Sequence, residues 1–244
     1  MRYFLEFAYK GTHYHGWQYQ PNASSVQETL NNALFTIFKN EIDLVGAGRT
    51  DAGVHAKQMF AHFDLEEPID VGYYVHKLNS FLPKDIAILK IHLVHQEAHA
   101  RFDATKRTYE YHIHTNKDAF ESDNSWYYHN LLNIDFMNAA CKILFNYFDF
   151  ECFSKVHTDV NTFNCKIYEA YWQPIDNRLV FTISADRFLR NMVRAIVGTM
   201  VNIGLEKVSL QEFITIIEGK DRNKAGFSVP AHGLYLTKVE YPFL

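Results

Sequence analysis

Apolar side chains stand at every second position near the start of the chain, between Tyr3 and Tyr9. This period of two predicts a β-strand with one buried face. The tetrapeptide Ser25-Val26-Gln27-Glu28 has the form of a capping box, and apolar residues recur after it at helical spacing as far as Ile37. A helix is therefore predicted over 26–37. The other elements predicted in this half are strands at 42–45, 54–65 and 85–94 and a helix at 70–81 that ends before Pro83.

The second half repeats the order strand, helix, strand, strand, helix, strand. Two strands, 165–173 and 179–185, are predicted as a hairpin around Asp176-Asn177. The mostly apolar run 188–203 predicts a helix, and Ser209-x-x-Glu212 caps an additional helix that ends at Gly219. The remaining predicted elements are strands at 106–115 and 234–241 and a helix at 135–147.

This order predicts an α+β protein made of two ferredoxin-like (β-α-β-β-α-β) subdomains, residues 1–104 and 105–244. No stretch rich in Pro, Gly or Ser separates them. We therefore expect the halves to pack into one mixed or antiparallel sheet with helices on one side. A cleft between them is the natural place for an active site.

Composition narrows the class of protein. The 244 residues carry a net charge of −4, from 24 basic and 28 acidic side chains, which excludes a uniformly basic nucleic-acid coat but not a local basic groove. The 20 Phe, 15 Tyr and 3 Trp residues exclude a disordered chain. These rings either form the core or line a site for flat molecules.

Cysteines and apolar runs indicate the compartment. Cys141, Cys152 and Cys165 are odd in number and lack C-x-x-C spacing, so neither a disulfide framework nor a thiolate zinc site is expected. The N-terminus reaches Glu6 before any apolar run of signal length, and no apolar stretch approaches the ~20 residues that cross a bilayer. We expect a soluble protein of a reducing cytoplasm.

A glycine-rich loop, Gly46-Ala47-Gly48-Arg49-Thr50-Asp51-Ala52-Gly53, separates two predicted strands. It is not a dinucleotide-binding fingerprint, because Asp51 stands at the third glycine position, and not a P-loop, because Val54 replaces the lysine. The glycines could present the Asp51 carboxylate at the apex of the loop. A plain hairpin turn is the alternative, since Asp and Gly are common in turns.

The predicted helix 188–203 and the residue before it carry a set of arginines. On a continuous helix, Arg187, Arg190 and Arg194 fall within about 60° of one another, and most other positions are apolar. Such a stripe either lines a cleft and offers guanidinium groups to phosphate or a buried acid, or extends into solvent.

Other polar and aromatic pairs have simpler interpretations. Tyr109 and Tyr111 share a strand face with Ile113, which core packing explains. The i,i+2 histidine pairs, His13/His15 and His112/His114, could suit a metal, but no further ligand spacing completes a site. No metal is predicted.

Seven further segments accompany the block Gly46–Ala56: Tyr9-Lys10-Gly11-Thr12 with Gly16-Trp17-Gln18, Ala100-Arg101-Phe102, Arg107-Thr108-Tyr109-Glu110-Tyr111, Asp149-Phe150 with Phe153, Met192-Val193-Arg194, Ile196-Val197-Gly198, and Gly233-Leu234-Tyr235-Leu236. In this order they resemble the tRNA pseudouridine synthase A family. The resemblance covers the chain from its first strand to its last, and the Gly46–Ala56 block is its most specific part.

The resemblance implies an isomerase that converts uridine to pseudouridine in tRNA and needs no cofactor. It implies that Asp51 is the catalytic carboxylate, that Tyr109 stacks on the uracil and helps remove the C5 proton, and that Arg194 pairs with Asp51 across the two halves. A nearby guanidinium favours the charged form of a buried carboxylate. Attack at C6, attack at C1′ and a glycal route all remain open for Asp51.

The resemblance also implies an RNA partner and a homodimer. The usual targets of that family are positions 38, 39 and 40 of the anticodon stem-loop, which are recognised through shape, phosphates and stacking. Arg49 would fill the space left by the target base or grip a phosphate. Val193 and Ile196 would line the pocket. The candidate phosphate contacts are Arg101, Lys106, Arg107, Arg187 and Arg190, with Lys220, Arg222 and Lys224 as further cations that a solvated loop also explains.

Two other functions remain as alternatives. A non-catalytic RNA-binding module would show RNP1-type aromatic signatures, which the chain lacks, and would have no use for the Arg49-Thr50-Asp51 apex. A nucleoside or glycoside hydrolase would pair two carboxylates, and Asp51 has no evident second acid beside it in the sequence.

Overall fold

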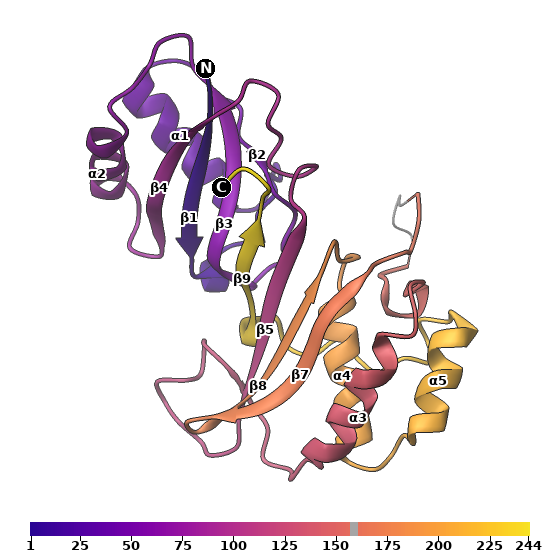
Figure 1. Cartoon of the computed structure of the whole chain (residues 1–244). Helices are drawn as coiled ribbons and strands as arrows, with labels where there is room; N and C mark the ends of the chain where they lie inside the picture. The colour runs from indigo at the N-terminus through magenta and orange to yellow at the C-terminus, as the bar shows by residue number, and fades with distance from the viewer. Residues whose placement is uncertain (157–160) are drawn as a thin grey trace. The chain divides into compact units, whose positions relative to one another are not determined.

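The computed structural model describes residues 1–156 and 161–244 (Figure 1). The contacts within the chain group it into two units. The first unit comprises Met1–Thr105 and Tyr235–Leu244, and the second comprises Lys106–Leu234. Among the described residues there are nine strands and five α-helices, so the predicted α+β class is confirmed.

The first unit is an antiparallel sheet with two helices. β1 pairs antiparallel with both β3 and β4, and β2 pairs antiparallel with β3, which gives the strand order β4-β1-β3-β2 of a ferredoxin-like fold. Helix α2 contacts β4 and α1. The elements are β1 (Arg2–Tyr9), α1 (Val26–Phe38), β2 (Val45–Gly46), β3 (His55–Asp64), α2 (Val71–Phe81) and β4 (Ile86–Val94).

The last strand, β9 (Leu234–Glu240), also belongs mainly to this unit. It pairs in parallel with β3, where His55 lies opposite Tyr235. The rings of Tyr241 and Phe243 then pack edge-on against Phe4, at centroid distances of 5.1 and 5.7 Å. Phe4 lies on the face of β1 opposite to Leu5, and both are buried, so β1 is covered on both faces although its sequence alternates.

The grouping of the C-terminal strand differs from the expected subdomains. The expected boundary, between 104 and 105, lies one residue from the observed change at 105/106. Residues 235–244, however, group with the first unit instead of with 105–234, because β9 pairs with β3 and its rings pack on β1.

The second unit repeats part of the same order. β8 pairs antiparallel with β5 on one side and with β7 on the other, and the predicted β7–β8 hairpin turns at Asp176, whose φ is 52°. Short β6 pairs in parallel with β5. The elements are β5 (Lys106–His114), β6 (Trp126–Tyr127), α3 (Ile134–Leu144), β7 (Ile167–Ile175), β8 (Arg178–Ala185), α4 (Met192–Gly204) and α5 (Leu210–Gly219).

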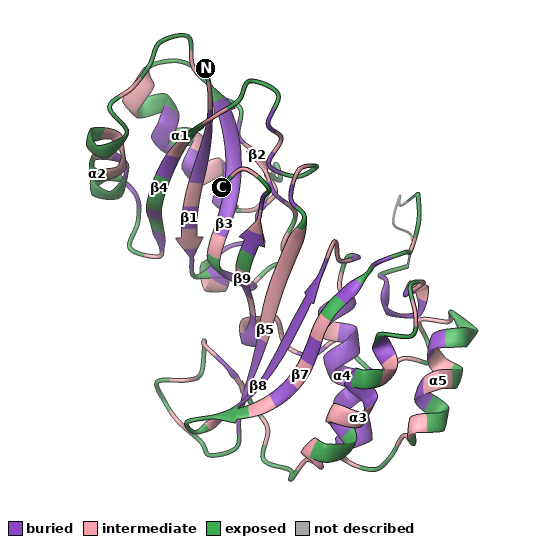
Figure 2. Ribbon diagram, in the orientation of Figure 1, coloured by how far each residue is buried: buried purple, intermediate pink, exposed green. Residues whose placement is uncertain are grey.

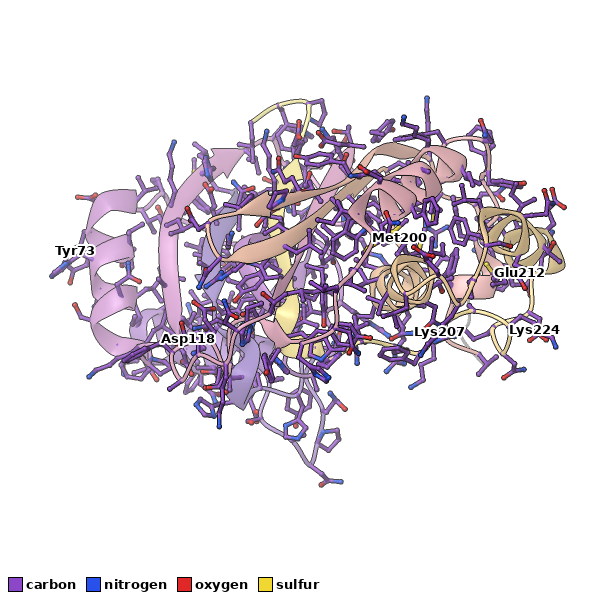
Figure 3. All side chains as sticks on the ribbon, turned by 90° about the horizontal axis from the view of Figure 1, so that it is seen from below. Tyr73, Asp118, Met200, Lys207, Glu212 and Lys224 are labelled. Carbon is purple, nitrogen blue, oxygen red and sulfur yellow. The ribbon has the colours of Figure 1, made fainter. Side chains whose placement is uncertain are left out.

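Trp172 of β7 joins two helices to one face of this sheet. Its backbone N–H donates to Asn138 Oδ1 of α3 at 2.8 Å, and its indole Nε1–H donates to Met200 Sδ of α4 at 3.2 Å. Met200 is labelled in Figure 3, in the interior of the unit. Figure 2 shows α4 buried along most of its length, and only Arg194 and Asn202 of this helix are not buried.

Helix α4 begins later than the sequence pattern predicts. The predicted helix started at 188, whereas the observed one starts at Met192. Asn191 has a left-handed backbone with a φ of 68°, which a right-handed helix cannot contain. Arg187 and Arg190 therefore precede the helix, and the predicted stripe of three arginines on one helical face is wrong.

Two further features concern membrane spans and cysteines. No helix in the described part of the chain is both long and apolar enough to span a membrane. Cys141, Cys152 and Cys165 are buried and free, and burial raises the pKa of each thiol to about 12.

Candidate active site

Asp51 lies in the first unit, on the loop 47–54 between β2 and β3. The loop is closed by its own backbone, because the N–H of Val54 donates to the carbonyl of Asp51 at 3.2 Å. Gly53, with a φ of 79°, donates its N–H to the carbonyl of Tyr14 at 3.2 Å. Asp51 is half-buried and Arg49 is exposed. The turn that carries the carboxylate is thus fixed to a second loop.

That second loop, residues 11–17, lies backbone to backbone against the first. A Cβ on Gly11 would lie 2.0 Å from the carbonyl oxygen of Val54, and one on Gly16 would lie 2.2 Å from that of Thr50. Gly16 also has a φ of +90°. Only glycine permits this approach at both positions. Two motifs separated in the sequence therefore form one structure around Asp51.

Side chains hold the residues on both sides of Asp51. The Tyr9 hydroxyl and Thr50 Oγ1 are hydrogen-bonded at 2.8 Å. His55 Nδ1 accepts the N–H of Gly11 at 3.0 Å, and its buried ring stacks on Tyr235 with a centroid distance of 4.6 Å. These contacts hold the loop more extensively than the backbone of a plain hairpin turn would.

Arg194 lies in the first turn of α4, in the second unit. Its Nε–H donates to the carbonyl of Val229 at 2.7 Å, and the N–H of Val229 donates to the carbonyl of Arg194 at 3.4 Å. Arg194 is half-buried in a helix that is otherwise almost entirely buried. Its guanidinium is therefore oriented by a backbone carbonyl.

The two tyrosines of β5 differ in their surroundings. Tyr111 is fully buried and its hydroxyl donates to the carbonyl of Pro230 at 2.8 Å. Burial raises the pKa of Tyr111 far above its usual value, and the nearby charge of Arg194 offsets part of this rise. Tyr109 is only half-buried, and its ring meets Phe188 edge-on at 5.2 Å. Core packing accounts for Tyr111, whereas Tyr109 keeps part of its surface open.

Four of the predicted phosphate-binding cations lie at the start of β5 or after the end of β8: Lys106, Arg107, Arg187 and Arg190. Arg107 is half-buried and its Nη1 donates to the carbonyl of Asp186 at 2.7 Å. Arg187 Nη1 reaches the carbonyl of Thr162 at 3.4 Å. Arg190 is exposed, and Lys106 is half-buried. Arg107 thus lies beside the end of β8, whereas the Arg187 guanidinium reaches Thr162, and the two share no helix.

Arg101 lies on a tight turn of the first unit. His99 Nδ1 accepts the backbone N–H groups of Arg101 and Phe102 at 3.1 and 3.3 Å. Phe102 is 74% exposed, and the Arg101 guanidinium carbon lies 5.7 Å from the centre of its ring. The turn holds an arginine and an aromatic ring at the surface.

The remaining candidates have various surroundings. Val193 and Ile196 are buried in α4 within the second unit. Lys220 forms an ion pair with Asp149, and Lys224 is exposed. Arg222 instead points inward: its Nη1 donates to the carbonyl of Gly226 at 2.9 Å and its Nη2 to Ser228 Oγ at 3.0 Å.

The histidine pairs have other partners. His112 Nε2 lies 2.9 Å from Glu110 Oε2, and His114 Nδ1 lies 2.7 Å from Ser125 Oγ. His13 and His15 are exposed. Within the residues that the structure describes, no group of three or more His, Cys, Asp or Glu side chains could hold a metal ion.

Some residues that support the site carry no local signal in the sequence. Tyr9, His55 and Tyr235 fall within the matching segments, but nothing in those segments indicates that they meet around one loop. The stretch 226–230 was not predicted to contribute, although it contacts both Arg194 and Tyr111. Both groups depend on contacts between distant parts of the chain, which no periodicity encodes.

Comparison with known proteins identifies the family. A family model described as tRNA pseudouridine synthase matches residues 7–103 and 140–242. The chain therefore belongs to the tRNA pseudouridine synthase family, and the predicted class of enzyme, an isomerase acting on tRNA, is confirmed.

Three relatives that match over nearly the whole chain share the name tRNA pseudouridine synthase A. The tRNA pseudouridine synthase A of Parabacteroides distasonis is 53% identical over 242 residues, covering 99% of this chain and 96% of that protein. The protein of the same name from Bacteroides fragilis is 54% identical over 243 residues, with coverages of 99% and 96%. That of Bacillus subtilis is 37% identical over 245 residues and covers 99% of each chain.

Proposed function

We propose that this protein isomerises uridine to pseudouridine at positions 38, 39 and 40 of the tRNA anticodon stem-loop. The observation that carries the proposal is the loop 47–54, in which a carboxylate is fixed between two motifs in a chain that matches the family along most of its length. The relatives named tRNA pseudouridine synthase A support the choice of tRNA as substrate.

The reaction rearranges one nucleotide. The bond from C1′ to N1 of uracil breaks, the base turns, and a bond from C1′ to C5 forms. The proton on C5 leaves and N1 gains one, so the product is an isomer of the substrate. Oxidation and hydrolysis play no part in this balance.

In this proposal Asp51 is the carboxylate that acts on the nucleotide, and it must be ionised to do so. A guanidinium binds a carboxylate through charge-assisted hydrogen bonds. Arg194 is the proposed partner. Its Nε–H bond to the Val229 carbonyl supports the proposal, because a guanidinium oriented in advance loses less entropy when it binds an anion.

Tyr109 is proposed to stack on the uracil and to help remove the C5 proton, directly or through water. Its open surface and the edge-on contact with Phe188 support a ring held in place but accessible. A target in a stem must leave its base stack, which costs a few kcal/mol. Arg49, exposed two residues before Asp51, is proposed to occupy the vacated space or to bind a flanking phosphate.

The proposed RNA contacts extend beyond the nucleotide. Arg101, Arg107, Arg187 and Arg190 are proposed to bind phosphates, and Val193 to line the pocket. Arg101 and Arg190 are exposed, as such contacts require. We also propose that the protein acts in the cytoplasm and as a homodimer.

Tritium release tests the reaction. Protein is incubated with tRNA labelled with tritium at C5 of uridine, and the RNA is then analysed for strand integrity and free uracil. A synthase releases tritium and leaves the strand intact. Free uracil with an abasic site would indicate a hydrolase, and bound RNA with neither product would indicate a binding module; either result would refute the proposal.

A further inference from the structure

Residues 226–230 run along the first two turns of α4, within the second unit. The N–H of Gly226 donates to Thr199 Oγ1 at 2.8 Å. A Cβ on Gly198 would lie 1.9 Å from the carbonyl oxygen of Phe227. The backbone of the segment is therefore in direct contact with the helix backbone. Because the two are closely packed, a displacement of the segment would also displace α4.

This segment supplies a hydrogen-bond acceptor for Arg194. The Val229 carbonyl accepts the Arg194 Nε–H at 2.7 Å. The guanidinium is planar, so a hydrogen bond at Nε restricts the directions in which its other N–H groups point. The Val229 carbonyl thus contributes to the orientation of the arginine.

Arg222 also binds this segment. It donates from Nη1 to the Gly226 carbonyl at 2.9 Å and from Nη2 to Ser228 Oγ at 3.0 Å. Ser228 Oγ also accepts the Asn191 Nδ2–H at 2.8 Å, and Asn191 is the left-handed residue at which α4 begins. Ser228 therefore connects Arg222 to the start of the helix that carries Arg194.

We propose that Arg222 is a positioning residue, which orients Arg194 for the reaction by holding Ser228 and the Val229 carbonyl. This inference rests on the proposed role of Arg194. The sequence placed Arg222 among cations of a loop that either binds RNA or is solvated, whereas its two donors engage this protein. The planar fork of arginine suits two acceptors on neighbouring residues, which a single ammonium group does not.

Three variants test the inference. Arg222→Gln removes the fork, Ser228→Ala removes the shared acceptor, and Lys207→Gln, which removes an exposed cation of the same unit with no proposed role, is the control. We expect Arg222→Gln and Ser228→Ala to lower kcat for tritium release by roughly tenfold to a hundredfold, since small misplacements of a catalytic group have effects of that order. The Kd for tRNA should change less than about twofold, and Lys207→Gln should leave kcat unchanged.

A spectroscopic readout separates positioning from general destabilisation. The Arg194 Nε–H resonance is assigned by its loss in Arg194→Lys and is followed by ¹H–¹⁵N NMR well below the melting temperature. In Arg222→Gln this resonance should shift and exchange faster with solvent, while in Lys207→Gln it should stay in place. If Arg222→Gln does not fold, Ser228→Ala carries the same measurement.

The outcomes separate the proposed catalytic role of Arg194 from the positioning role of Arg222. If Arg194→Gln keeps full turnover, the proposed role of Arg194 is wrong, whatever the resonance shows. If Arg194→Gln is inactive but Arg222→Gln and Ser228→Ala leave both kcat and the resonance unchanged, the positioning role is overturned. A weaker Kd with a smaller salt dependence and unchanged kcat would instead make Arg222 a phosphate contact and would also overturn it.

Discussion

At the scale of residues, close contacts hold the loop that carries Asp51. Gly11 and Gly16 allow one loop to lie against another, and the Tyr9 hydroxyl holds Thr50 directly before the carboxylate. The resemblance of its loop to the family made Asp51 the candidate, since the local motif alone also allowed a plain turn. Its supports could not be predicted, because Tyr9 and His55 reach the loop only after the chain has folded.

Gly16→Ala tests how strictly the loop depends on this packing. Its new methyl group would meet the Thr50 carbonyl at 2.2 Å on a backbone with positive φ, so we expect a loss of about 1–3 kcal/mol in the free energy of unfolding and a lower kcat. Gly48→Ala is the matched control, since nothing lies within 4 Å of its added Cβ. Urea unfolding and tritium release measure both effects; equal behaviour of the two variants would contradict the packing described here.

His62 predicts how stability depends on pH. Its Nδ1 accepts the N–H of Ala100 at 3.2 Å, and burial, with help from the charge of Arg2, lowers the pKa of His62 to about 4. The unfolded chain, with a pKa near 6.5, then binds protons that the folded chain does not. The contribution of neutral His62 to the free energy of unfolding is therefore complete above pH ~6.5. It is lost as the pH falls towards 4, and the loss is at most about 3 kcal/mol.

His62→Gln checks this prediction, because glutamine can accept the same N–H and does not titrate between pH 4 and 7. Chemical unfolding at several pH values in that range should give a visibly shallower slope for the variant. His99, whose pKa burial also lowers, should account for part of the slope that remains. An identical slope in both proteins would show that His62 does not carry the effect.

At the scale of elements, capping and turn residues were the reliable signals. Ser209 and Glu212 form the predicted capping box of α5, and Asp176 turns the predicted hairpin. Figure 3 labels Glu212 at this helix end. The start of α4 was missed, because apolar residues continue at helical spacing through 188 and 189 while the left-handed Asn191 interrupts the backbone. Periodicity reports which side chains are buried, and it does not report a single φ angle.

Ser209→Ala should weaken α5 without changing the chemistry. Ser209 Oγ accepts the N–H of Glu212 at 3.2 Å, and loss of such a cap costs about 1 kcal/mol in the free energy of unfolding. Thr215→Ala, at an exposed position within the same helix, is the control and should be neutral or slightly stabilising. Thermal and urea unfolding provide the comparison, and a neutral Ser209→Ala would indicate that the box does not stabilise the helix.

At the scale of the whole molecule, the α+β class, most of the elements and the family followed from the sequence. The placement of β9 did not, because a strand at the end of the chain can join either unit and only its pairing decides. The net charge of −4 is compatible with an RNA substrate if basic residues are locally concentrated. Arg107, two residues before Tyr109 on β5, and Arg187 are the proposed members of such a concentration.

The salt dependence of tRNA affinity tests whether these arginines bind phosphates. If several phosphates are bound by these arginines, counterion release should lower tRNA affinity by at least about tenfold between roughly 50 and 200 mM salt. Arg187→Gln should reduce the slope of log Kd against log salt by about one, with little change in kcat. Filter binding over a salt series measures both, and an affinity insensitive to salt would contradict phosphate binding.

The central claim is that the carboxylate of Asp51 performs the isomerisation. Tritium release from uridine-labelled tRNA is most direct when wild type is compared with Asp51→Asn, which keeps the shape of the side chain and removes its charge. Asp43→Asn, at an exposed acid of the same unit, is the control. We predict a rate at least about a thousandfold lower for Asp51→Asn, with tRNA binding retained, and an unchanged rate for Asp43→Asn. Full tritium release by folded Asp51→Asn would contradict the account.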